Sequence, residues 1–150
     1  MAIGRLAGDG AGSTTLATFT AVDEATDAVA NASATVYLPM ANAIAFVLDV
    51  TAAADGVDDT CDVYVQTLLG AAFWVDVVHF TQVTGTSEPD RYIAKVCSQL
   101  ATAEFDNATG LGAAAVRNIM GDAWRVYCTV VDGGVATAEA FTFTVTAIPM

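Results

Sequence analysis

Segments of strand length, in which apolar and polar residues alternate, constrain this chain more than any other feature. The clearest is the last, Phe141-Thr142-Phe143-Thr144-Val145-Thr146, with its apolar residues and its threonines at alternate positions. Successive side chains of a strand point to opposite faces, so this period of two predicts a half-buried β-strand. This segment lies within the predicted strand Ala140–Ile148. The other strand-length segments are Ile44–Thr51, Thr60–Leu69, Phe73–Val83, Arg91–Ser98 and Ala123–Val131.

Turn-forming residues separate these segments. Ala54-Asp55-Gly56, Met120-Gly121-Asp122 and Asp132-Gly133-Gly134 are examples, because Gly tolerates positive φ and Asp caps its own backbone. Short strands at this spacing favour an antiparallel sandwich or small barrel over βαβ units. We predict an all-β protein, an antiparallel β-sandwich of jelly-roll or immunoglobulin-like kind. A weak strand is expected at Thr102–Asp106. Gly112–Met120 is expected to be helical or strand-like, with a helical turn possible only at Ala113–Arg117.

One strand is apolar on both faces. If Phe73, Val75 and Val77 point inward, then Trp74, Val78 and Phe80 lie on the opposite side. A strand of this kind is either central and covered, or part of a subunit interface. We therefore expect Trp74, Val78 and Phe80 to contact a partner or the N-terminal segment.

The chain is expected to divide near residue 34. Residues 1–34 are rich in Gly, Ala, Ser, Thr and Asp, and their short apolar islands are too few for a core. We interpret them as an extended N-terminal arm that becomes ordered against a neighbouring subunit through Leu16 and Phe19. Residues 35–150 would form the β-sandwich domain.

Composition excludes several classes of function. Seventeen acidic and five basic residues give a net charge of −12, so no Lys/Arg cluster is available for direct nucleic-acid binding. Apolar runs are too short for a membrane span, and the first residues have no apolar core of a signal peptide. The acidity suits solubility, docking on a basic surface, or a salty environment.

Candidate residues for chemistry are few. His79, the single histidine, has no Cys or second His near it in sequence, which favours a structural role. Asp55, Asp58 and Asp59 could bind calcium, but their spacing misses the EF-hand pattern, so a solvated turn is the simpler interpretation. We predict no catalytic residue, no metal site and no cofactor.

Cysteines and aromatic residues leave two alternatives open. Cys61, Cys97 and Cys128 are odd in number and lie within strand-like segments, which favours buried free thiols over a disulfide. Trp74 and Trp124 are expected in a core or interface, although exposed tryptophans could also stack on sugars.

Several segments together carry a resemblance. They are Phe46-Val47-Leu48-Asp49-Val50-Thr51, Cys61-Asp62-Val63-Tyr64-Val65-Gln66, Trp74-Val75-Asp76, Phe80-Thr81-Gln82-Val83-Thr84-Gly85 and Trp124-Arg125-Val126. Over residues 43–148 this succession resembles small β-sandwich virion proteins of tailed bacteriophages, which include capsid decoration (cement) and head-fibre proteins.

The resemblance implies a structural virion protein and not an enzyme. It would assemble in the host cytoplasm, bind the major capsid protein on the outer surface of the head, stabilise that shell, and associate with itself, for example as a trimer. No membrane and no direct nucleic-acid contact would be involved. The alternative is a tail or fibre module that binds a host glycan through Trp74, Tyr92 or Trp124.

Overall fold

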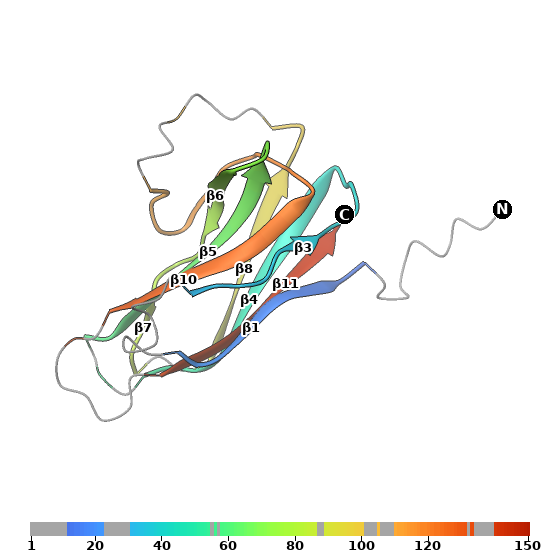
Figure 1. The fold of residues 1–150 in the computed structure, drawn as a ribbon. Helices are drawn as coiled ribbons and strands as arrows, with labels where there is room; N and C mark the ends of the chain where they lie inside the picture. Colours follow the sequence, from blue (N-terminus) through green and yellow to red (C-terminus); the bar gives the residue numbers. More distant parts are fainter. Residues whose placement is uncertain are drawn as a thin grey trace.

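Two antiparallel β-sheets pack face to face in the computed structural model of the chain (Figure 1). The structure describes residues 12–22, 31–54, 56, 58–86, 89–100, 105, 110–131, 133 and 140–150, and none of these is helical. The strands are β1 (Thr14–Val22), β2 (Asn31–Ala32), β3 (Val36–Tyr37), β4 (Ala43–Ala52), β5 (Thr60–Leu69), β6 (Phe73–His79), β7 (Val83–Thr84), β8 (Asp90–Cys97), β9 (Ala115–Val116), β10 (Ala123–Val131) and β11 (Phe141–Pro149).

The order of the strands defines a jelly roll. Sheet A runs β1-β11-β4-β8, and sheet B runs β2-β10-β5-β6-β9, with β3 added beside β10 and β7 beside β5. Consecutive long strands mostly alternate between the sheets, as in the paired Greek keys of a jelly roll. In an immunoglobulin-like sandwich the last strand lies in the same sheet as its predecessor. Here β10 and β11 lie in different sheets, which decides between the two predicted kinds of sandwich.

The core lies between the inner faces of the two sheets. Phe46 and Leu48 of β4, Val65 of β5, Trp124 of β10 and Phe143 of β11 are essentially inaccessible to solvent. Each fully buried large apolar side chain contributes roughly 1.5–3 kcal/mol to the free energy of unfolding. The inward faces predicted for β4, β5 and β11 are confirmed, and the alternation of apolar and polar residues places them there.

The predicted division at residue 34 is wrong for the described part of the N-terminal segment. β1 pairs antiparallel with β11 over most of its length. Leu16 is 4% exposed within the core, and Phe19 stacks on Phe143 with ring centroids 4.9 Å apart. β1 is therefore an edge strand of the sandwich itself. Its own alternation is interrupted by two register shifts, which explains why the pattern is weak in the sequence.

A β-bulge removes the second apolar face predicted for β6. Val65 lies opposite Val78 and Gln66 opposite Asp76, so Val77 has no partner between them. The extra residue shifts the alternation by one position, and Val78 turns to the inner face that Val75 and Val77 already occupy. Val78 and Phe80 are 0% and 3% exposed and belong to the chain's own core. They therefore do not form an exposed subunit interface; the core to which they belong also contains Leu16 and Val22 of the N-terminal segment, which was the other alternative.

Three other predictions concern the ends of strands. Phe73, expected to point inward, is 68% exposed at the start of β6. Ala113–Arg117 forms a turn followed by β9 and not a helical turn; Ala114 adopts a φ of 57° there. The strand predicted at Thr102–Asp106 lies outside the described residues, except for Phe105.

Candidate interaction surface

Exposed and half-buried apolar side chains gather at one end of the sandwich. We call this surface the methionine end and define it as Pro39, Met40, Ala41, Met120, Pro149 and Met150. Met40 is 100% exposed and Met150 63% exposed. In Figure 1 this end carries the C-terminus and the start of β4. Exposed apolar groups brought together in this way commonly mark an interaction site.

Backbone hydrogen bonds fasten the methionine end to the two sheets. The N–H of Leu38 donates to the carbonyl of Asp122 at 3.0 Å, and the N–H of Met150 donates to the carbonyl of Ala43 at 2.8 Å. Ser98 donates to the carbonyl of Asn42 through its N–H at 2.9 Å and through its hydroxyl at 3.0 Å. The backbone that carries Met40 and Met150 is thus held in place, while their side chains reach solvent.

Two hollows open on this surface and share Met40, Ala41 and Asn42. One has a volume of about 420 Å³ and also contacts Met120; the other has about 540 Å³ and also contacts Met150. Methionine is flexible and polarisable, so its side chain adapts to an irregular partner surface. The methionine end therefore suits contact with a second protein surface.

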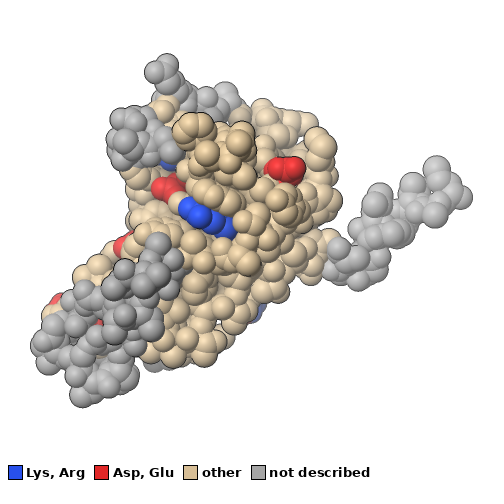
Figure 2. Space-filling view, in the orientation of Figure 1, with Lys and Arg blue, Asp and Glu red and all other residues tan. Residues whose placement is uncertain are grey.

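The outer face of sheet B carries a hydrogen-bonded row of polar residues. Nε of Arg125 donates to Gln66 at 2.7 Å, and Gln66 in turn donates to Asp76 at 2.7 Å. The Arg125 guanidinium also lies 4.2 Å from the ring centroid of Trp74, a cation–π geometry. Partial burial lowers the pKa of Arg125. In the face that Figure 2 shows, basic atoms lie near the middle, an acidic group lies beside them, and few other charged groups are present.

His79 lies at the other side of the same face, beneath β9. Nδ1 lies 2.7 Å from the carbonyl oxygen of Leu111 and donates to it, while Nε2 lies 2.8 Å from Oδ1 of Asp62. The ring stacks on Tyr64 at 4.0 Å between centroids. Burial and the nearby Asp62 and Asp76 raise the pKa of Tyr64 to about 12. His79 thus fastens the segment before β9 to sheet B, which agrees with the structural role predicted for it.

The structural role of Asp59 differs from both interpretations of its loop, a calcium site and a solvated turn. It is 2% exposed, and its carboxylate accepts hydrogen bonds from the N–H groups of Gly56 at 3.1 Å and Gly133 at 2.9 Å. Asp58 is exposed, and Asp55 lies outside the described residues. Asp59 therefore ties two loops together, so it is not part of a solvated turn. Among the described residues, no group of three or more His, Cys, Asp or Glu is placed to hold a metal ion.

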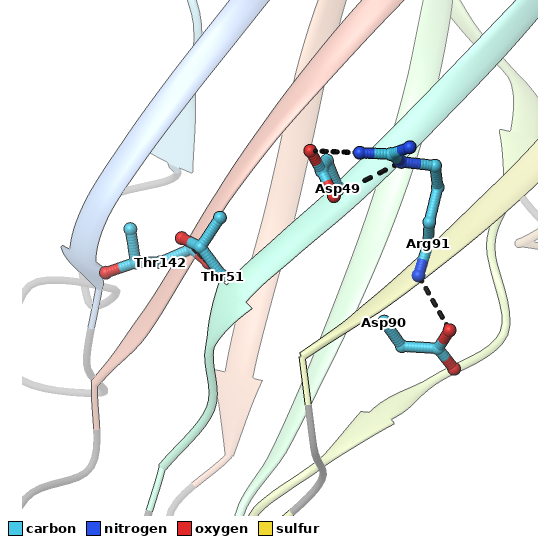
Figure 3. Close-up of polar contacts among 5 residues, drawn as sticks. All are labelled: Asp49, Thr51, Asp90, Arg91 and Thr142. Carbon is cyan, nitrogen blue, oxygen red and sulfur yellow. Dashed lines mark hydrogen bonds and ion pairs between the residues drawn. The ribbon is translucent and has the colours of Figure 1, made fainter.

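The outer face of sheet A is rich in threonine and carries an exposed ion pair. Arg91 of β8 donates to both carboxylate oxygens of Asp49 of β4, at 3.3 and 2.9 Å (Figure 3). The hydrogen bond and the charge of Asp49 raise the pKa of Arg91. Beside this pair the hydroxyl of Thr51 donates to the carbonyl of Thr142 at 3.3 Å. Such exposed contacts shape the surface and add little stability.

The interface predicted from the sequence is not assembled as one surface. Leu16 is buried in the core, as are Val78 and Phe80, and Phe19 packs on Phe143. Trp74 is half-buried on the outer face of sheet B. The methionine end was missed because its members are far apart in sequence. The sequence contains one local indication of this surface. Pro39-Met40 follows directly after a short apolar strand, and Met40 is not part of the two-residue pattern that accounts for the apolar residues of the core.

Trp124 and the cysteines are internal. Trp124 is 0% exposed and packs on Phe46, with ring centroids 5.1 Å apart. None of the three cysteines forms a disulfide within the described residues; Cys61 and Cys128 are buried, as predicted, and Cys97 is partly buried. In the described residues no helix is long and apolar enough to cross a membrane.

The fold and its surfaces define a jelly-roll protein with an apolar end that suits docking. No protein-family model matches the chain, and neither a curated protein nor a solved structure is detectably similar to it.

Proposed function

We propose that the chain is a structural virion protein, a capsid decoration protein that binds the outer surface of a phage head and stabilises it. The observation that carries the proposal is the methionine end, where Met40 and Met150 lie exposed beside two hollows on a rigidly hydrogen-bonded backbone. The jelly roll supports it, since this fold is common in viral capsid domains. So does the resemblance of residues 43–148 to decoration proteins.

The stabilising effect would follow from mass action. A protein that binds the assembled shell and not its free subunits shifts the equilibrium towards the shell, and many equivalent sites repeat the effect. The net charge of −12 suits a basic patch on the major capsid protein. Apolar contact at the methionine end would then supply the binding energy, and charge would steer the approach.

A glycan-binding tail or fibre module is the alternative, and the aromatic residues give it less support. Trp124 is completely buried and cannot stack on a sugar. Arg125 lies against the ring of Trp74, and Tyr92 is half-buried at the edge of sheet A. A sugar platform needs an accessible ring face, and none of the three residues offers a fully exposed one.

The test is to measure the copy number of the chain in purified phage particles and to locate it by cryo-electron microscopy. Decoration requires many copies in proportion to the major capsid protein. A few copies at the tail tip, or none in the particle, would overturn the proposal.

Variants identify the surface that binds. Met40→Asp and Met150→Asp are expected to weaken binding to undecorated heads at least about tenfold, since a charge would have to be desolvated at the contact. Thr18→Asp, on the exposed face of β1, is the matched control and should bind normally. Equal binding by all three variants would exclude the methionine end as the docking surface.

A further inference from the structure

One edge of sheet A is formed by β8, which among the described strands pairs only with β4. In an antiparallel pair the backbone groups of alternate residues point towards the partner strand and away from it. Ser98 N–H donates to the carbonyl of Asn42 on the β4 side, whereas Cys97 N–H donates to Oδ1 of Asn118 on the other side at 3.0 Å. The odd-numbered residues of β8 therefore direct their N–H and C=O groups outward.

At both ends of this edge the outward N–H group already has a hydrogen-bond acceptor within the chain. Arg91 N–H donates to Oδ1 of Asp90 at 2.7 Å (Figure 3), and Cys97 N–H donates to Asn118. Ile93 and Lys95 lie between them, and their outward backbone groups have no partner within the described part of the chain. A strand of a few residues could pair with these two positions, which is how β-strand addition recognises an extended peptide.

Side chains beside Ile93 and Lys95 offer apolar contacts to an added strand. Ile93 is 70% exposed on the outer face of sheet A, and Val116 of β9 is 37% exposed across a groove. The groove has a volume of about 290 Å³. Tyr92 and Ala94 of β8 line one side of it, and the segment that leads into β9 lines the other. An incoming strand would gain both main-chain hydrogen bonds and apolar contact.

Charge determines which strand fits. Arg91 and Lys95 flank Ile93 on the same face, and Lys95 has no ion-pair partner among the described residues. An antiparallel pairing with a second copy, centred on Ile93, would place Lys95 opposite the Arg91 of that copy. Like charges directly opposite each other destabilise a strand pair, whereas opposite charges stabilise it. The edge thus opposes self-association and favours an acidic strand.

We propose that the open edge of β8 binds an extended segment of a partner protein, with an apolar residue opposite Ile93 and an acidic residue two positions to either side of it. This inference does not depend on the proposed function, since the methionine end and the β8 edge use different residues.

Two capped synthetic peptides test it, Thr-Asp-Thr-Val-Thr-Asp-Thr and the same peptide with lysine in place of both aspartates. We expect the acidic peptide to slow hydrogen exchange at the amides of Ile93 and Lys95, and the basic peptide to bind about tenfold more weakly or less. Equal binding of the two peptides, or protection elsewhere than on β8, would overturn the proposal.

Variants separate the edge from general charge effects. Lys95→Glu should weaken the acidic peptide and favour the basic one, while Thr20→Glu, on β1 at the opposite edge of sheet A, should leave both affinities unchanged. Ile93→Pro removes one outward N–H and should abolish binding; if that variant fails to fold, Lys95→Glu still decides. Dimerisation through β8 without peptide, detected by analytical ultracentrifugation and abolished by Ile93→Pro, would assign the edge to a second copy and refute the proposal.

Discussion

Val78 lies directly opposite Val65 across the β5–β6 pair, although the residue before it, Val77, has no cross-strand partner. This bulge brings Val75, Val77 and Val78 to the same side of the sheet, so an apolar run that would have two faces in a regular strand has one. The whole run packs within the chain's own core.

Val78→Asp is therefore expected to unfold the monomer. A carboxylate in this fully buried position has no charged partner, and the free energy of unfolding should fall by roughly 4 kcal/mol or more. Urea denaturation measures the change. Phe73→Asp on the same strand is the control: Phe73 is 68% exposed, so the cost should stay below about 1 kcal/mol. A folded Val78→Asp protein that only fails to associate would contradict the assignment.

Two side-chain pairs, Asp62–His79 on sheet B and Asp49–Arg91 on sheet A, should differ in their contribution to stability. Asp62 and His79 have side chains 17% and 7% exposed, whereas Asp49 and Arg91 are 42% and 62% exposed. Asp62→Ala leaves the buried Nε2 of His79 without its hydrogen-bond partner and should cost about 1–3 kcal/mol. Asp49→Ala removes only a solvent-screened contact, so it should cost clearly less than Asp62→Ala, and less still at high salt. Equal losses in urea denaturation would show that burial of the His79 pair has no energetic consequence.

Tyr64 should make the fold sensitive to alkaline pH. Its pKa is raised from 10.0 to about 12 in the folded protein, so folding favours the neutral phenol. The resulting stability is fully present below pH 10 and is lost as pH rises from there towards 12. Tyr64→Phe cannot ionise. Urea midpoints of both proteins should therefore converge or cross over this interval, and a constant difference between them would contradict the prediction.

Gly85 should not tolerate a side chain. Its N–H donates to the carbonyl of Asp59 at 2.7 Å, and an added Cβ would overlap the carbonyl oxygen of Gly56. Gly85→Ala should lower the free energy of unfolding by about 1–3 kcal/mol, because backbone has to move. Gly112→Ala is the matched control, since no atom lies within 4 Å of its added Cβ. Thermal unfolding of both variants compares them, and similar losses would show that crowding at Gly85 is not the cause.

The two-residue period in the sequence determined that the protein is all-β, and it located the long strands of the core. β5 and β10 begin and end where the pattern does, at Thr60–Leu69 and Ala123–Val131. Phe46, Leu48 and Val50 point inward because side chains of a strand alternate whatever its partners are. Information of this kind is local, so one segment of sequence contains all of it.

Only the tertiary structure decided the sheet order, the membership of β1, the bulge at Val77 and the methionine end. Each depends on contacts between residues distant in sequence: Phe19 packs on Phe143, Val78 faces Val65, and Met40 lies beside Met150. A strand pattern specifies which face is apolar but not which strand will cover it. The physical reason is that pairing and packing are chosen by the folded chain as a whole, through non-local burial that no single segment encodes.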